Sequence, residues 1–108
     1  MSRDVVNNWF KAFRQKDISL LQLAEDFVHV SPFGEIRGRE IYLDLIRQNP
    51  DAFFSPTIDI IDVLEDGDRF AVRYLLNGNP SCDCIYVRDD QIAEIHSYYH
   101  YGDKPSFS

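Results

Sequence analysis

The chain has 108 residues, of which 44% are hydrophobic, 27% charged and 14% aromatic, and its formal net charge is −7. This size and balance predict one globular domain over residues 1–108 with its own core, and they exclude a disordered chain. A net-acidic chain without a basic run repels phosphate backbones and anionic lipid, so we expect neither nucleic acid nor a membrane surface as a partner.

The start of the chain has the pattern of helices. Apolar residues recur at three- and four-residue steps on one face of a first predicted helix, namely Val6, Trp9, Phe10 and Phe13. Asp17 is then a candidate N-cap for a second short helix. The apolar side of this second helix would consist of Leu20, Leu21, Leu23 and Ala24.

A brief strand and a third helix come next. Residues 27–30 predict the strand, and the sequence Ser-Pro-Phe-Gly at 31–34 interrupts it. We expect the helix from about Gly38 to Arg47, because its apolar side chains are spaced four residues apart. Asn49-Pro50 ends this helix, since the residue before a proline disfavours helical backbone.

The remaining residues predict strands. β-Branched and aliphatic residues fill 57–64, 69–76, 81–87 and 91–101, and turn signals separate these segments at 65–68, 77–80 and 89–90. Helices followed by such a meander predict an α+β fold, with three N-terminal helices packed on one face of a mainly antiparallel sheet.

Alternation along the strands assigns side chains to the two faces of the sheet. One face carries apolar residues and a single carboxylate: Phe70, Val72, Tyr74, Leu76, Asp83, Ile85, Val87, Ile95, Ser97 and Tyr99. The opposite face carries Cys82, Cys84, Tyr86, His96, Tyr98 and His100. Asp83 is therefore the most informative residue of the pattern.

The two cysteines, Cys82 and Cys84, are one residue apart, which is a poor spacing for an unstrained disulfide. Reduced thiols indicate a cytoplasmic protein, and the absence of an apolar run long enough for a signal or a membrane span agrees with that expectation. No further Cys or His at ligand spacing completes a metal site, so we expect no metal.

Several short motifs, taken in order, resemble one family. They are the aromatic first helix, Lys16-Asp17-Ile18, Ser31-Pro32-Phe33-Gly34, Arg37-Gly38-Arg39-Glu40 and the last strand Ile92-Ala93-Glu94-Ile95-His96-Ser97-Tyr98-Tyr99. Nearly the whole chain resembles the SnoaL-like branch of the nuclear-transport-factor-like superfamily, which includes ketosteroid isomerases, polyketide cyclases and limonene epoxide hydrolases. The resemblance implies a strongly bent, cone-shaped (cystatin-like) sheet that encloses a pocket. Members use this fold for many chemistries, so the family does not supply a reaction.

Ketosteroid isomerases combine an Asp base with an oxyanion hole made of a Tyr and a protonated Asp. By resemblance, the base position is Ser31, the Tyr position is Trp9, and the oxyanion Asp is Asp83. Serine cannot accept a proton as a carboxylate does, and indole is not an acidic phenol. The resemblance therefore does not imply the steroid isomerase reaction.

Asp83 and His29 are the candidate catalytic residues. Asp83 in an apolar pocket would favour its neutral form and act as an acid or donor, whereas at a strand edge it would be solvated and inert. His29 shares a face with Ser31 and could replace the missing base, or it could be packed and bonded to backbone. Ser31 itself is more readily explained by a bond to local backbone than by a nucleophile.

A set of mostly aromatic residues is predicted to line the pocket, although stripes of this kind also build ordinary cores. The candidate lining residues are Trp9, Phe13, Ser31, Phe33, Phe70, Val72, Tyr74, Ile85 and Tyr99. On the opposite face, a homodimer interface or a plain solvated surface would contain Tyr86, His96, Tyr98 and His100.

These observations predict a protein that binds a small hydrophobic organic molecule with a carbonyl or hydroxyl group. If it is an enzyme, it would be a cofactor-free isomerase, cyclase or hydrolase that uses Asp83 with His29. The alternative is a non-catalytic module, either a ligand sensor or a dimeric protein-interaction domain. The sequence leaves open whether the protein is an enzyme. A metal protein using Cys82 and Cys84 is a third hypothesis.

Overall fold

The computed structural model describes residues 2–99. Its helical elements are α1 (Ser2–Gln15), the 3₁₀ turn η1 (Ile18–Leu20), α2 (Arg39–Gln48) and α3 (Pro50–Phe54). Its strands are β1 (Leu23–Ser31), β2 (Gly34–Arg37), β3 (Ile58–Asp66), β4 (Arg69–Leu76), β5 (Asn79–Arg88) and β6 (Gln91–Tyr98).

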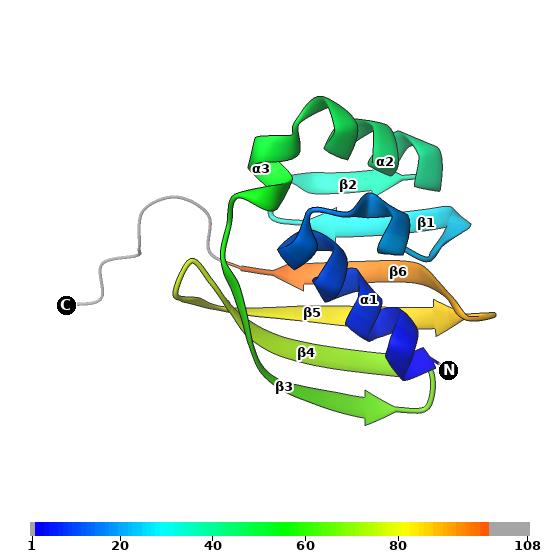
Figure 1. Ribbon diagram of the computed structural model, residues 1–108. Helices are drawn as coiled ribbons and strands as arrows, with labels where there is room; N and C mark the ends of the chain where they lie inside the picture. Colours follow the sequence, from blue (N-terminus) through cyan, green and yellow to red (C-terminus); the bar gives the residue numbers. More distant parts are fainter. Residues whose placement is uncertain (1, 100–108) are drawn as a thin grey trace.

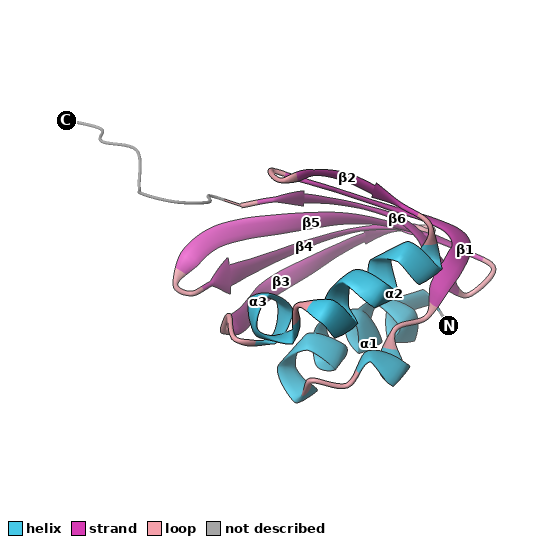
Figure 2. Cartoon of the chain, turned by 90° about the horizontal axis from the view of Figure 1, so that it is seen from above, coloured by secondary structure: helices cyan, strands magenta, loops and turns pink. Residues whose placement is uncertain are grey.

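The strands form one curved sheet in the order β2-β1-β6-β5-β4-β3, and the helices cover one of its faces (Figures 1 and 2). α1 packs against β5 and β6, and α2 packs against β1 and β2. Adjacent strands are antiparallel except for β1 and β6, which run parallel. The expected α+β fold with a bent, mainly antiparallel sheet is confirmed.

Curvature has a local cause in three of the strand pairs. Pairing shifts register between Ile60 and Asp62 in β3, between Tyr86 and Val87 in β5, and between Leu23 and Val28 in β1. Such irregularities bend a strand and increase its twist. The bent sheet wraps around the helices, and no helix of residues 2–99 covers its other face (Figure 2).

The predicted second helix is wrong in extent. Asp17 does cap it, because its Oδ1 accepts a hydrogen bond from the Ser19 backbone N–H at 3.0 Å, but only the single turn η1 follows. Leu23 and Ala24 lie in β1, both almost fully buried. Leu23 pairs with Ile92 of β6, so burial in the sheet outweighs the weak local preference for helix.

Two elements escaped the sequence analysis. Asn49-Pro50 ends α2 as expected, but Pro50 also begins α3, where its fixed φ suits a first helical position. Strand β2 begins at Gly34, the last residue of the predicted break, and pairs with β1. Its four residues are too few to show a period.

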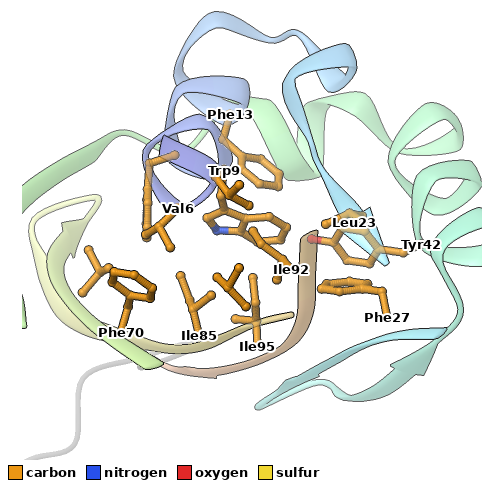
Figure 3. Packing of buried hydrophobic residues seen from close by; sticks show 14 of the residues in the cluster. Val6, Trp9, Phe13, Leu23, Phe27, Tyr42, Phe70, Ile85, Ile92 and Ile95 are labelled. Atoms are coloured by element: carbon orange, nitrogen blue, oxygen red, sulfur yellow. The ribbon is translucent and has the colours of Figure 1, made fainter. Parts of the chain in front are cut away.

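The core lies between α1 and the sheet. Val6, Trp9 and Phe13 descend from α1 toward Phe70, Ile85 and Ile95 on the strands, while Tyr42 and Phe27 pack beside Trp9 (Figure 3). Trp9 is 4% exposed, and its ring lies 4.8 Å from Phe13 and 5.9 Å from Tyr42, measured between centroids. The aromatic cluster around Trp9 thus fills the centre of the core, and it also borders a cavity.

Candidate functional site

A cavity of about 450 Å³ lies between the helices and the concave face of the sheet. Its wall is mainly apolar and aromatic, and it includes residues from α1, α2, α3 and each of the strands β1 to β6. The polar side chains on the wall are His29, Ser31, Tyr42, Asn49, Tyr74, Asp83, Ser97 and Tyr99. An apolar hollow with a few converging polar groups has the character of a small-molecule site.

Asp83 lies in the middle of β5 with 3% of its surface exposed. The Tyr74 hydroxyl donates a hydrogen bond to its Oδ1 at 2.9 Å, and Ser97 and the Trp9 indole also donate to the carboxyl. Burial nevertheless raises the pKa of Asp83 from 3.8 to about 6, because desolvation of the charged form outweighs the three donors. The site holds a weak acid that titrates just below neutrality.

His29 is the second titratable group of the cavity. Its Nε2 lies 2.9 Å from the Ser97 Oγ, while its Nδ1 is buried and has no hydrogen-bond partner among residues 2–99. The imidazole packs near the rings of Trp9, Phe27 and Tyr42, with centroids 5.3–6.4 Å away. Burial, helped by the charge of His96, lowers the pKa of His29 to about 4, so the ring is neutral at physiological pH.

Two tyrosines add phenol groups close to Asp83. Burial and the nearby carboxylate raise the pKa of Tyr74 and of Tyr42 well above the usual range, so both phenols stay protonated at neutral pH. The oxygen of Tyr42 is turned toward the Trp9 ring (Figure 3). The polar end of the cavity is therefore rich in neutral hydrogen-bond donors.

Most residues expected in the pocket lie on the cavity wall. This set comprises Trp9, Phe13, His29, Ser31, Phe33, Tyr74, Asp83 and Tyr99. Phe33, at the rim, is 63% exposed. The Ser31 Oγ accepts a hydrogen bond from the Phe33 backbone N–H at 3.2 Å, which is a local structural role and not that of a nucleophile.

Three residues proposed for the pocket are not on its wall. Phe70, Val72 and Ile85 are almost fully buried in the core. Figure 3 shows Phe70 and Ile85 on the sheet close to Val6, so α1 covers the part of the face to which they belong. Alternation assigns a side chain to a face, but it cannot tell where along the face a helix lies.

Three polar residues of the wall were not predicted for the site, namely Ser97, Tyr42 and Asn49. Asn49 was expected only as the end of a helix. Ser97 bridges His29 and Asp83, and Tyr42 reaches the wall from α2. The signal for Ser97 was present, because alternation already set it on the same face as Asp83. The helical position of Tyr42 gave no hint of a polar role, since one face of α2 is apolar throughout.

The outer face of the sheet carries a second hollow, of about 370 Å³, next to Cys84, Tyr86 and His96. The Arg69 guanidinium lies over the Tyr86 ring, His96 is bonded to Glu94, and Tyr98 is 60% exposed. His100 lies outside the described residues. Within residues 2–99, no three His, Cys, Asp or Glu side chains come together as a metal site.

Over the same residues, no helix has the length and apolar character required to cross a membrane.

The sequence of the chain matches the model of the SnoaL-like domain over residues 6–95. The chain therefore belongs to the SnoaL-like family. No curated protein matches it.

Solved structures share the fold. A proposed ketosteroid isomerase from Kribbella flavida is 19% identical with a TM-score of 0.80, and the alignment covers 99% of this chain and 83% of that one. A proposed polyketide cyclase from Sinorhizobium meliloti is 22% identical with a TM-score of 0.77, covering 91% and 99%. IdmH, a proposed polyketide cyclase from Streptomyces antibioticus, is 24% identical with a TM-score of 0.73, covering 92% and 91%. At these identities the likeness concerns the fold.

Proposed function

We propose that the protein binds a small, mostly apolar organic molecule that carries a carbonyl or hydroxyl oxygen, with Asp83 as the group that recognises this oxygen. One observation carries the proposal: a carboxyl that is 3% exposed faces an apolar cavity and has a pKa of about 6. A carboxyl without a solvent shell is stabilised by a partner that accepts its proton in a hydrogen bond.

The shape of the cavity limits the ligand. About 450 Å³ lies in the lower part of the usual range for small-molecule sites, roughly 300–1,000 Å³. Aromatic rings from α1 and β4 form flat walls, and the polar groups gather around Asp83. A compact ring system with one oxygen substituent at its end matches this distribution.

Turnover would use Asp83 as the acid. With a pKa of about 6, roughly one molecule in ten carries the proton at pH 7, and the rest hold a carboxylate that can accept one. Transfer of this proton to a ligand oxygen, and its return, would support isomerisation, cyclisation or water addition without a cofactor. His29 would take part through Ser97, because Ser97 separates its Nε2 from the carboxyl.

Binding without turnover is a second candidate, and one observation favours it. The hydroxyl of Ser31, at the position where the related isomerases hold their base, is bonded to the backbone of Phe33. No carboxylate on the cavity wall other than Asp83 is available to act as a second acid–base group within residues 2–99. Such a site suits a ligand sensor.

The proposal is tested with a matched pair of probes, 2-acetylnaphthalene and 2-ethylnaphthalene, whose fluorescence reports binding. The ketone should bind more tightly than the hydrocarbon. At pH 5, where most molecules carry the Asp83 proton, Asp83→Leu should weaken the ketone about tenfold and leave the hydrocarbon nearly unchanged, whereas Asp83→Asn keeps a donor and should retain most of the affinity. Equal binding of both probes to the wild type, or no binding, would contradict the proposed recognition.

We further propose that the protein is a homodimer through the outer face of the sheet, which carries Tyr86, His96 and Tyr98 and which no helix of the described part of the chain covers. Apolar and aromatic groups exposed on such a face are stabilised by a second copy. Light scattering at micromolar concentration should give twice the chain mass of 12.6 kDa. Tyr98→Asp should return the mass to that of one chain, while a wild-type monomer would refute the interface.

A further inference from the structure

Ser97 stands between the two titratable groups of the cavity. It lies directly opposite Asp83 in the antiparallel pair of β5 and β6, and it is bonded to the Asp83 carboxyl. On its other side, its Oγ lies 2.9 Å from His29 Nε2, a contact that is buried. His29 reaches this point because β1 pairs parallel with β6, with His29 beside Ile95.

His29, Ser97 and Asp83 form a chain of hydrogen bonds, and the number of protons available determines which group donates to which. A serine hydroxyl has one proton, so Ser97 can donate to either the imidazole or the carboxyl, but not to both. If Ser97 donates to Asp83, its oxygen must accept from His29, and the imidazole then carries its proton on Nε2. In the reverse direction the imidazole proton would be on Nδ1.

The surroundings of Nδ1 favour the first direction. This atom is buried and has no hydrogen-bond partner within residues 2–99, and aromatic rings surround the imidazole. A buried N–H group without an acceptor is rarer in proteins than an acceptor left without a donor. In the Nε2–H tautomer, Nδ1 carries only a lone pair and no N–H group is left without an acceptor. His29 therefore donates to Ser97, and Ser97 donates to Asp83.

Asp83 then receives donors from all three of its hydrogen-bond partners within residues 2–99. Tyr74 donates to its Oδ1, the Trp9 indole can only donate, and Ser97 is held as a donor by His29. When Asp83 is protonated, the best acceptor for its carboxyl O–H is therefore a ligand oxygen in the cavity. Were Ser97 free to turn, the carboxyl proton could be directed at the serine oxygen.

We propose that Ser97 is a positioning residue, which His29 holds in the donor orientation so that the proton of Asp83 is directed toward an acceptor oxygen of the bound ligand. The chemistry selected is an acceptor-only oxygen, such as a ketone or aldehyde, over a hydroxyl that must also donate. This inference rests on the proposed role of Asp83 in ligand recognition.

The first test needs no ligand. Nitrogen-15 NMR of the histidine rings should show His29 as the neutral Nε2–H tautomer at pH 7. Carbon-13 titration of Asp83 should give a higher pKa in Ser97→Ala than in the wild type, because the substitution removes a donor that lowers it. Ser97→Thr keeps the hydroxyl and should preserve the wild-type value, as should Ser81→Ala, which removes a buried serine bonded to Asn79 instead.

These substitutions leave the other groups that act on the pair chemically unchanged. Tyr42 and Tyr74 face Asp83 from α2 and β4, and His96 acts on His29 from β6. A His29 ring found as the Nδ1–H tautomer in the wild type overturns the proposal whether or not any variant folds. An unchanged pKa of Asp83 in folded Ser97→Ala would overturn it too.

The second test uses 2-acetylnaphthalene with two variants at His29, at pH 5, where most molecules carry the Asp83 proton and His29 is still mostly neutral. His29→Phe removes the donor to Ser97 and should weaken the ketone about two- to tenfold, while 2-ethylnaphthalene is unaffected. His29→Gln restores an N–H donor and should recover most of the affinity. Equal ketone affinity of the Phe and Gln variants overturns the positioning role. Failure of the ketone to bind the wild type would refute the proposed function, and the NMR measurements would still decide the direction of the chain.

Discussion

The difference in unfolding free energy between Asp83→Asn and the wild type should depend on pH, and it should shift in favour of the variant as the pH rises. The folded state raises the pKa of this carboxyl from 3.8 to about 6, so the folded protein holds its proton more tightly than the unfolded chain does. The stability that comes from the proton is complete below pH 3.8 and is lost as the pH rises through about 6. Above this range, the folded protein carries a desolvated charge that Asp83→Asn removes.

The magnitude follows from the shift. About two pKa units correspond to about 3 kcal/mol between the low- and high-pH limits. Asparagine presents an amide N–H₂ to a site whose partners Tyr74, Ser97 and Trp9 all donate, and this mismatch costs about 1–3 kcal/mol at every pH. The net gain at pH 8 is therefore small, but the change with pH is independent of the mismatch.

Urea unfolding of both proteins at pH 4 and pH 8 measures this change. The unfolding free energy of Asp83→Asn, relative to that of the wild type, should rise by about 2.5 kcal/mol between pH 4 and pH 8, slightly less than the limit because pH 4 lies near the unfolded pKa. Ser81→Ala, at a second buried position in β5, contains no titrating group and should give the same difference from the wild type at both pH values. A constant difference for Asp83→Asn would show that the carboxyl is solvated and would refute the proposed site.

Three further outcomes are expected. His29 has a pKa lowered from 6.5 to about 4, so its contribution to the unfolding free energy is present above pH 6.5 and lost as the pH falls toward 4. His29→Gln should abolish this loss of about 3 kcal/mol at acidic pH, as measured by urea unfolding. Asn77 has φ 51° and accepts two hydrogen bonds from Thr57, so Asn77→Ala should lower the unfolding free energy by about 1–3 kcal/mol, and Asn77→Gly, which tolerates this φ, by less. The wild type should not isomerise a 3-oxo-Δ5-steroid in a spectrophotometric assay, because Ser31 is not a base; appreciable turnover would show that the comparison of Ser31 with the isomerase base is misaligned.

The sequence predicted best those features that depend on local periodicity. The period of two placed Asp83 on the apolar face of β5, and the structure finds it there with 3% exposure. Turn signals also defined the β3–β6 meander, since Asn77 and Gly78 adopt the positive φ values that a tight hairpin needs. Both results follow from chemistry within a few neighbouring residues.

Features that depend on distant partners were not predictable. Leu23 and Ala24 suit a helix and a strand equally well, and only the pairing of Leu23 with Ile92 decides between them. Phe70 and Ile85 share the face of Asp83, yet the position of α1 assigns them to the core. The contact of His29 with Ser97 spans 68 residues, so no local pattern could reveal it.

The parallel pairing of β1 with β6 has a consequence for the order of folding. The hairpins of β3, β4 and β5 join neighbouring segments, whereas β1 must wait until the last strand of the described chain is available. Closing so long a loop is entropically costly and is expected late on the pathway. Because His29 comes from β1, Asp83 from β5 and Ser97 from β6, an intermediate in which β6 has not yet docked beside β1 would contain a formed meander and no acid–base site. Ligand binding should therefore begin only with the final, rate-limiting phase of refolding.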